Sequence, residues 1–302
     1  MHVQKSGNAL DAAKPSYFGT LCFQIAYDAA AAGMLGLWLT FNATPERMEF
    51  QFDTHAIRVT LPDSAALLAL VRVRLAARQG FALATINLDH LVKLNNSEAF
   101  RQAYAAQDMV VADGNPVVWL SRLARRPVAL VPGSDMVLPL AQAAADAGVA
   151  AALVGSSGAV LAAAADSLRA SVPGLRITMQ VAPAMGFDPE GAEAAHILQA
   201  LAQADIGLCF LALGAPKQEA FAARGRSLAP QVGFASVGAG LDFIAGHQTR
   251  APEWWRRFAL EWLWRTVSSP RRLLPRYAAC AAILPGQVLA ALRLRRQPSG
   301  QA

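Results

Sequence analysis

The segment Ala112-Asp113-Gly114 places a carboxylate and a turn directly after the apolar residues 109–111. If those residues form a buried strand, the Asp113 carboxylate leaves the strand end and enters the space beside the sheet. A carboxylate placed there can accept the proton of an attacking hydroxyl group, so Asp113 is our candidate general base. The alternative is that Asp113 only stabilises its own Asp-Gly turn.

A second polar segment, Gly214-Ala-Pro216-Lys217-Gln218-Glu219, follows a very apolar run. Gly214 permits close approach of the backbone to a ligand, and Pro216 and Glu219 suit the first turn of a helix. Helix capping does not explain the adjacent polar side chains of Lys217 and Gln218. We therefore expect this segment to contact a ligand.

A third segment, Gly155-Ser-Ser-Gly158, joins a predicted strand to a predicted helix. Backbone N–H groups at such a turn can bind a phosphate at the helix N-terminus. The alternative is that the glycines only allow tight packing of the strand and the helix. Neither G-x-G-x-x-G nor the P-loop pattern occurs in a strand-to-helix context in this chain.

Apolar periodicity predicts the elements that position these segments. Predicted strands cover residues 57–61, 81–87, 108–112, 149–154, 175–181, 206–213 and 232–237. Predicted helices cover residues 64–79, 135–147, 159–171, 190–204 and 218–228. This alternation predicts an α/β fold, a Rossmann-like, mostly parallel sheet with helices on both faces. Ligands of such sheets bind outside the carboxyl ends of the strands, where the polar segments fall.

Composition and charge divide the chain into parts. Apolar residues make up 54% and charged residues 16%, which suffices for a large buried core and excludes general disorder. The net charge is +6, but residues 250–302 hold ten Arg and two acids, so residues 1–249 carry −2. We predict an extension over 1–50, a catalytic domain over 51–248 and a basic helical C-terminal appendage over 249–302. All the basic residues of the appendage are Arg, which favours binding of a phosphate-bearing partner.

The appendage has the composition of a membrane-surface helix. Four Trp alternate with Arg within residues 254–265, which suits rings at headgroup depth and guanidinium groups on phosphates. An amphipathic helix packed on the core and a single-stranded nucleic-acid site are the alternatives. Pro285-Gly286 interrupts the apolar stretch that follows Tyr277, so we expect that stretch to lie on the surface.

Two other features argue for a cytosolic protein without a membrane span. Residues 21–41 are long enough to cross a bilayer, but Asp28 within them makes insertion unfavourable. The three cysteines have no metal-site spacing, and their odd number gives no disulfide framework. We expect them to be reduced thiols.

Ten segments in order resemble the WecG/TagA/CpsF glycosyltransferases, a family that includes N-acetylmannosaminyltransferases and GumM-like glucosyltransferases. The matching segments are Thr85-x-Asn87, Ala112-Asp113-Gly114, Gly133-x-Asp135, Pro173-Gly174-Leu175, Gly186-Phe187, Leu213 to Glu219, Gly238 through Asp242 to Gly246, Arg250-Ala-Pro252, Leu260 to Arg265, and Pro270-Arg through Arg276-Tyr277. They span about residues 55–277 in the family's order.

The resemblance implies inverting transfer of a sugar from a UDP-sugar to a polyprenyl-diphosphate-linked saccharide. It makes Asp113 the proposed base, puts Thr85 and Asn87 near the same pocket and makes Gln218 a substrate contact. It implies no cofactor and no obligatory metal, because appendage arginines stabilise the departing UDP. The substrate-binding residues that we expect are Thr85, Asn87, Gly114, Asn115, Gly133, Asp135, Gly155, Gly214, Pro216, Lys217, Gln218, Glu219, Gly238 and Asp242. The arginines expected at the leaving group or the membrane are Arg250, Arg265, Arg271, Arg272 and Arg276.

The resemblance also implies a peripheral enzyme on the inner face of a bacterial cell membrane, with an anionic membrane surface and not nucleic acid as its partner. Homo-oligomerisation, the sugar and the polysaccharide pathway stay open. One departure concerns Leu130, where relatives carry Arg; Arg125 or Arg126 are candidate replacements. Two other classes are kept as alternatives, a nucleotide-binding oxidoreductase on the same sheet and a non-catalytic peripheral membrane scaffold.

Overall fold

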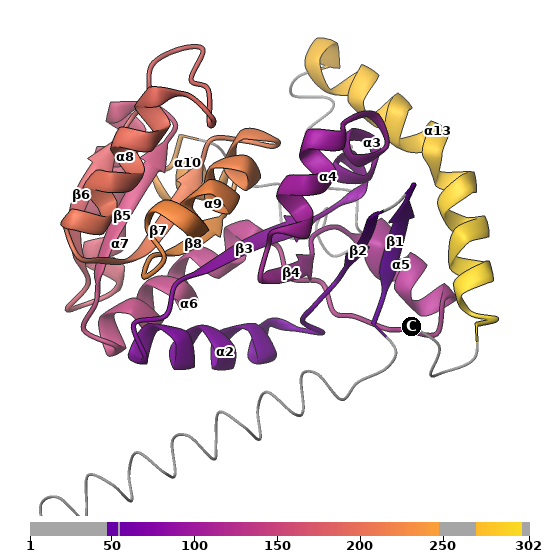
Figure 1. Ribbon diagram of the computed structural model, residues 1–302, viewed down its shortest axis with the longest axis horizontal. Coiled ribbons are helices and arrows are strands. Elements are labelled where there is room, and N and C mark those ends of the chain that lie inside the picture. Colours follow the sequence, from indigo (N-terminus) through magenta and orange to yellow (C-terminus); the bar gives the residue numbers. More distant parts are fainter. Residues whose placement is uncertain (1–46, 54, 248–269, 298–302) are drawn as a thin grey trace, which may run out of the picture. The chain divides into compact units, whose positions relative to one another are not determined.

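The computed structural model describes residues 47–53, 55–247 and 270–297 of the 302-residue chain. The predicted extension, apart from its last residues, and the Trp-Arg stretch 254–265 with Arg250 and Arg265 lie outside these ranges. The described residues all belong to one compact unit. Its centre is a parallel six-stranded sheet (Figure 1). The predicted α/β class with a parallel sheet is confirmed.

The sheet has the strand order β4-β3-β8-β7-β5-β6. Its strands are β3 (Phe81–Ile86), β4 (Met109–Ala112), β5 (Ala150–Gly155), β6 (Arg176–Val181), β7 (Ile206–Ala212) and β8 (Gly233–Ser236). The chain runs outward from β3 to β4, crosses to β5 and β6, and returns through β7 to β8 beside β3. The order therefore reverses next to β3, and a ligand crevice is expected at the carboxyl ends there.

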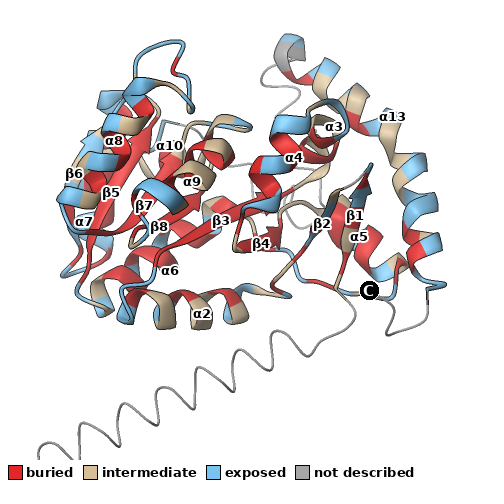
Figure 2. Cartoon of the chain, in the orientation of Figure 1, coloured by how far each residue is buried: buried red, intermediate tan, exposed pale blue. Residues whose placement is uncertain are grey.

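Two groups of helices cover the sheet. One group is α4 (Glu98–Ala105), α8 (Ala192–Gln203) and α9 (Lys217–Leu228); α9 contacts both of the others. The other is α2 (Ser64–Ala76), α6 (Gly133–Asp146), α7 (Gly158–Ser171) and the short α10 (Gly240–Ile244), with α6 in contact with the other three. β3, β5 and β8 are buried along their whole length (Figure 2), as strands covered on both faces must be.

A second apolar core lies beside β3 and β4. The hairpin of β1 (Glu49–Phe52) and β2 (His55–Arg58) forms a separate antiparallel sheet. Its residues Phe50 and Phe52 pack in one cluster with α3 (Leu88–Asn96), α4 and α5 (Asn115–Leu123). Apolar side chains of the C-terminal helix, Ala291 and Leu294, complete this cluster. The C-terminal helix is thereby fixed next to the carboxyl ends of β3 and β4.

The C-terminal helix α13 (Pro270–Leu294) covers the apolar stretch of the predicted helical appendage. The helix runs without a break through both Pro275 and Pro285. Proline removes one backbone donor, and at the exposed Pro285 water can bind the freed carbonyl. α13 contacts α3 and α5, which hold it on both sides of Pro285 (Figure 1). By length and composition alone, residues 273–294 are sufficient to cross a membrane.

Candidate functional site

The parallel pairing of β3 and β4 brings Thr85 and Asp113 together. Thr85 pairs with Val111 and Ile86 with Ala112, so both strands end at the same level. The Asp113 backbone N–H donates to the Ile86 carbonyl at 2.8 Å, which continues the ladder by one residue. Thr85 Oγ1 donates to Asp113 Oδ2 at 3.5 Å. The carboxylate of Asp113 is half-buried at the carboxyl end of the sheet, where a base would meet a substrate hydroxyl.

Buried side chains behind Thr85 hold this strand end. The Tyr104 hydroxyl donates to the Thr85 carbonyl at 2.6 Å, and His90 Nδ1 lies 2.7 Å from both oxygens. Burial, with the nearby Lys93 charge, lowers the pKa of His90 to about 4, so the ring is neutral at pH 7. Burial raises the pKa of Tyr104, and the carboxylates of Glu219, Asp113 and Asp89 raise it further. Three carboxylates therefore lie within electrostatic range of one phenol.

Asn87 and Gly114 lie beside Asp113 at the strand ends. Asn87 is the N-cap of α3, and its Oδ1 accepts from the His90 backbone N–H at 3.1 Å. Gly114 has φ +111°, and a Cβ there would lie 3.6 Å from the Asn87 Cβ. Any residue other than glycine at position 114 would strain the backbone, whereas its Cβ would make only an ordinary contact with Asn87. Asn115 follows as the first residue of α5.

The first turn of α9 brings a buried carboxyl to the site. Gln218 and Glu219 are 3% and 0% exposed, and Gln218 Nε2 donates to Glu219 Oε1 at 2.9 Å. Burial raises the pKa of Glu219 to about 7, although the Gln218 hydrogen bond and the Lys93 charge act the other way. Gln218 Oε1 and Glu219 Oε2 have no hydrogen-bond partner among the described residues. Unpaired buried acceptors of this kind need a ligand, a proton or water.

A chain of ion pairs joins α13 to α3 and to the turn before α9. Asp89, in the first turn of α3, forms an ion pair with Lys93 Nζ at 2.8 Å through one oxygen and with Arg276 Nε at 3.0 Å through the other, although Arg276 Nε makes no hydrogen bond to the described residues. Lys93 Nζ also donates to the Ala215 carbonyl at 3.2 Å, in the turn before α9. Burial alone would raise the pKa of Asp89, but Lys93 and Arg276 lower it overall. Arg276 is thus the one predicted appendage arginine with a described contact near the strand ends.

The loops after β5 and β8 form a second part of the site, built of small residues. Ser156 Oγ donates to Asp242 Oδ1 at 3.3 Å, which joins the two loops. A Cβ at Gly133 would lie 3.1 Å from Thr85 Cγ2, so the start of α6 packs against the first part. A Cβ at Gly155 would lie 2.5 Å from the Ala212 backbone. Gly155 is therefore required for close packing of β5 on β7.

The structure places the other predicted residues more peripherally. Asp135 is exposed at the start of α6 and accepts from Ser134 at 3.3 Å. Gly214 and Gly238 occupy turns with positive φ, and Lys217 is half-buried as the first residue of α9 after Pro216. Arg271 is exposed on α13, and the side chain of Arg272 is not described.

The position of Leu130, where relatives carry Arg, is exposed. Of the two candidate replacements, Arg126 donates to the Arg47 carbonyl at 3.2 Å, away from the strand ends. Arg125 is exposed and has positive φ at the end of α5.

Several residues of the site escaped the sequence analysis, namely Asp89, His90, Lys93, Tyr104 and Ser236. Ser236 is the buried last residue of β8, and its Oγ has no hydrogen-bond partner among the described residues. Asp89 and Lys93 stand at i and i+4 directly after the N-cap Asn87, a recognisable helical ion pair. His90 and Tyr104 carry no such signal, because only the fold brings them to the Thr85 carbonyl. Within the described ranges, no group of three or more His, Cys, Asp or Glu is arranged to hold a metal ion.

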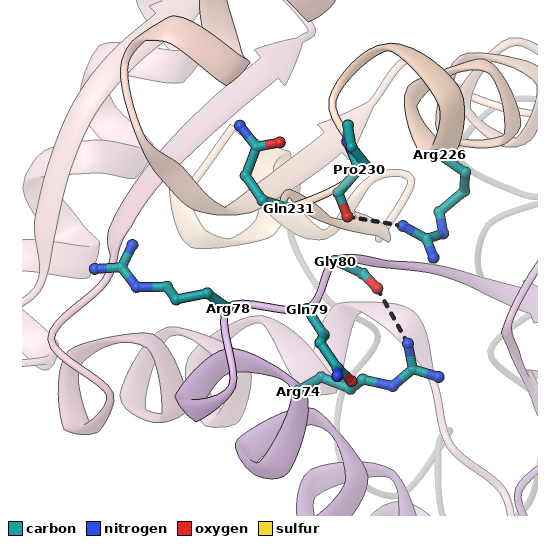
Figure 3. A pocket seen from close by; sticks show the side chains of 7 residues that line it. All are labelled: Arg74, Arg78, Gln79, Gly80, Arg226, Pro230 and Gln231. Carbon is teal, nitrogen blue, oxygen red and sulfur yellow. Dashed lines mark hydrogen bonds between the residues drawn. The ribbon is translucent and has the colours of Figure 1, made fainter.

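A pocket at the opposite, amino end of the sheet is lined by basic side chains (Figure 3). Arg74 Nη1 donates to the Gly80 carbonyl at 3.3 Å, and Arg226 donates to Pro230 O at 3.0 Å and to Asp108 at 2.8 Å. Arg78 pairs with Asp205. These contacts fasten the starts of β3 and β8 and lie far along the strands from Asp113.

The comparison with known protein families agrees with the geometry at the carboxyl ends. Residues 52–299 match the family model described as the glycosyl transferase WecG/TagA/CpsF family. The match includes every strand of the parallel sheet, the Asp113 corner and α13. The chain therefore belongs to the WecG/TagA/CpsF glycosyltransferase family.

Proposed function

We propose that the chain is an inverting hexosyltransferase that moves a sugar from a UDP-sugar to a hydroxyl group of a polyprenyl-diphosphate-linked saccharide. The product would be an intermediate of a cell-surface polysaccharide, such as an exopolysaccharide or a teichoic-acid-like polymer. The observation that carries the proposal is the half-buried Asp113 carboxylate beside Thr85 at the strand ends.

The proposed reaction is a single displacement. The acceptor oxygen attacks C1 of the donor sugar as Asp113 takes its proton, and the bond from C1 to the diphosphate oxygen breaks. UDP leaves with the bonding electron pair. A base with this task must be ionised in the resting enzyme and within hydrogen-bond reach of the hydroxyl. Thr85 Oγ1 donates to one oxygen of Asp113, which orients the carboxylate at the strand end.

Positive charge for the leaving diphosphate is assigned to arginines of the appendage. The ion pair with Asp89 places Arg276 beside the first turn of α3. A guanidinium group can bind a phosphate through two parallel hydrogen bonds. Arg250, Arg265, Arg271 and Arg272 are further members of the proposed set. We propose that no metal or other cofactor is needed, so transfer should persist in excess EDTA.

A peripheral position on the inner face of the cell membrane is supported by α13. Its side away from α3 and α5 exposes Leu274 and Leu289 at 61% and 50%. Exposed Arg293, Arg295 and Arg296 follow at its end, and no acid lies in the helix. An apolar face next to cationic groups is suited to an anionic bilayer surface, where a polyprenyl-linked acceptor resides.

Replacement of Asp113 by Asn tests the base. We expect kcat for transfer to fall by about a thousandfold, with donor binding and melting temperature little changed, because an amide keeps the shape but cannot accept the proton. Asp166→Asn, which removes an exposed carboxylate on α7, is the matched control and should retain activity. An Asp113→Asn enzyme with normal turnover would refute the assignment.

The donor and the reaction class are tested by a panel of UDP-sugars, including UDP-ManNAc, UDP-ManNAcA and UDP-glucose, with a polyprenyl-diphosphate-linked acceptor and mass readout. Transfer of one hexose unit supports the proposal. Binding of NAD(P) without transfer would favour an oxidoreductase. Vesicle binding with neither transfer nor donor hydrolysis would favour a non-catalytic scaffold.

A further inference from the structure

The Asp89 carboxylate joins three segments that are distant in sequence. It lies in α3 two residues after Asn87, and its two oxygens receive Lys93 and Arg276 separately. The Asp89 side chain is 12% exposed, against 38% for Arg276. Through the second contact of Lys93, the Ala215 carbonyl is held to the same cluster. One mostly buried carboxylate thus connects α13, α3 and the turn that precedes Gln218 and Glu219.

A cysteine of α13 lies next to this cluster. Cys280 stands one helical turn after Arg276, is 6% exposed and faces the protein interior. Burial raises the pKa of its thiol; the Asp89 carboxylate raises it further, while Arg276 and Lys93 lower it. All three charged groups therefore lie within electrostatic range of Cys280. The thiol reports locally on whether α13 is seated against α3.

We propose that Asp89 is a positioning residue, which with Lys93 fixes α13 and the turn at residues 214–216 against α3, so that the seating of α13 sets the geometry of the strand-end site. The seating itself follows from contacts in the chain alone. Its effect on transfer rests on the proposed function, in which Arg276 stabilises the departing UDP.

The charges explain why one carboxylate carries this role. Without Asp89, the Lys93 ammonium and the Arg276 guanidinium would be two neighbouring cations with no shared counter-charge. Removal of one partner from a partly buried ion pair leaves the other desolvated and uncompensated. The apolar contacts of α13 through Ile283, Ala291 and Leu294 lie further along the helix. These contacts keep the C-terminal part of α13 attached. The loss of Asp89 should therefore loosen the N-terminal part of the helix, which carries Arg276.

The test compares two variants of the full-length chain, Asp89→Asn and Arg276→Met. Each is treated with iodoacetamide, and the peptide that carries Cys280 is quantified by mass spectrometry. Electrostatics alone predicts opposite results, because removal of Asp89 lowers the thiol pKa and removal of Arg276 raises it. Unseating of α13 predicts faster modification in both. We expect an increase of about tenfold in each variant, because reactivity follows the open population.

The controls separate seating from general unfolding. Asp166→Asn removes the carboxylate of an exposed ion pair on α7 and should leave Cys280 protected. Modification of Cys209, which is fully buried in β7, should stay slow in every variant. Opposite changes at Cys280 in Asp89→Asn and Arg276→Met, or no change in either, would overturn the positioning role.

Kinetics test the functional half of the inference. Asp89→Asn should lower kcat/KM for transfer by about tenfold while Asp113 is intact. Lys93→Met, which keeps the Asp89–Arg276 pair, should lower transfer with little change at Cys280, because it frees only the Ala215 turn. Faster Cys280 modification with unchanged transfer would show that seating does not govern the site. A wild-type chain inactive on every donor would refute the proposed function and leave the thiol result standing.

Discussion

The two ends of the parallel sheet both carry polar side chains, but they use them differently. At the amino end, Arg74 and Arg226 are engaged by carbonyl groups and by Asp108. At the carboxyl end, the buried Gln218 Oε1, Glu219 Oε2 and Ser236 Oγ have no partner among the described residues. The pocket lined by arginines therefore has a structural role in this fold, because its side chains hold neighbouring segments together. The unsatisfied buried acceptors mark the end where a substrate is expected.

Backbone packing sharpens the contrast. A Cβ at Gly80 would lie 2.4 Å from the carbonyl oxygens of both Pro230 and Val232, so the starts of β3 and β8 are in close contact. At the other end, Cβ atoms at Gly214 and Gly238 would meet nothing within 4 Å. The starts of β3 and β8 are closed by packing, whereas the turns at Gly214 and Gly238 have open space beside them. Substitutions at the amino end should therefore change stability without changing activity.

The largest effect on stability is expected from Glu219→Gln, at the carboxyl end. The folded-state pKa of Glu219 is about 7, raised from 4.5, so the buried carboxyl favours folding below pH 4.5 and loses this advantage as the pH rises to 7. The variant cannot ionise. Its free energy of unfolding should equal that of the wild type near pH 4 and exceed it by on the order of 3 kcal/mol at pH 8.

Urea denaturation of both proteins at pH 4, 6 and 8 measures this difference. His90 titrates with the opposite sign, because its lowered pKa makes acidification from 6.5 to 4 destabilising, but it is present in both proteins and cancels. A constant difference across the pH range would mean that Glu219 has the same pKa in the folded and the unfolded protein. Burial at the carboxyl end would then not disfavour its ionised form.

Much of the architecture could be predicted from sequence. The predicted strand 81–87 and helix 64–79 correspond to β3 and α2 within a few residues, because long apolar runs and the cap Asp63 mark them clearly. α3, α4 and α5 were missed. They are short, and their buried residues interleave with polar ones such as His90 and Arg101, whose burial depends on partners elsewhere in the chain. The helix α13 runs through Pro285 because its tertiary contacts outweigh one lost backbone bond.

The site residues could be predicted from sequence only where a chemically suitable side chain stands at the end of a predicted strand. Asp113 and Thr85 follow strands, so the parallel sheet brings them together. Gly155 stands at an equally suggestive turn, and its close packing against Ala212 is a requirement that no local pattern reveals. Asp89 could be assigned to a helical pair with Lys93. Its contact with Arg276 joins residues nearly two hundred positions apart and needs the fold.

A smaller effect on stability, with none on activity, is expected from Asp108→Ala at the amino end. Asp108 Oδ2 accepts from the Ala82 backbone N–H and from Arg226 Nε, both at 2.8 Å. The variant leaves both donors unpaired, which should lower the free energy of unfolding by about 2 kcal/mol. At a temperature where the variant is fully folded, kcat/KM for transfer should match the wild type. A lower kcat/KM at that temperature would show that the contacts of Asp108 also contribute to catalysis.

The smallest effect is expected from Arg74→Met, which keeps the aliphatic stem and removes the guanidinium. The single bond from Arg74 to the Gly80 carbonyl is 3.3 Å long and partly exposed, so its loss should cost less than about 1 kcal/mol in thermal or urea unfolding. The pocket of Figure 3 would lose one of its three cationic walls. If that pocket bound the diphosphate of the donor, the variant would have a higher KM for the UDP-sugar. We expect KM to stay constant, because Arg74 only holds the chain at the start of β3. An increase in KM of about tenfold, equal to the loss of one good phosphate contact, would place the donor at the amino end and reverse the contrast between the two ends of the sheet.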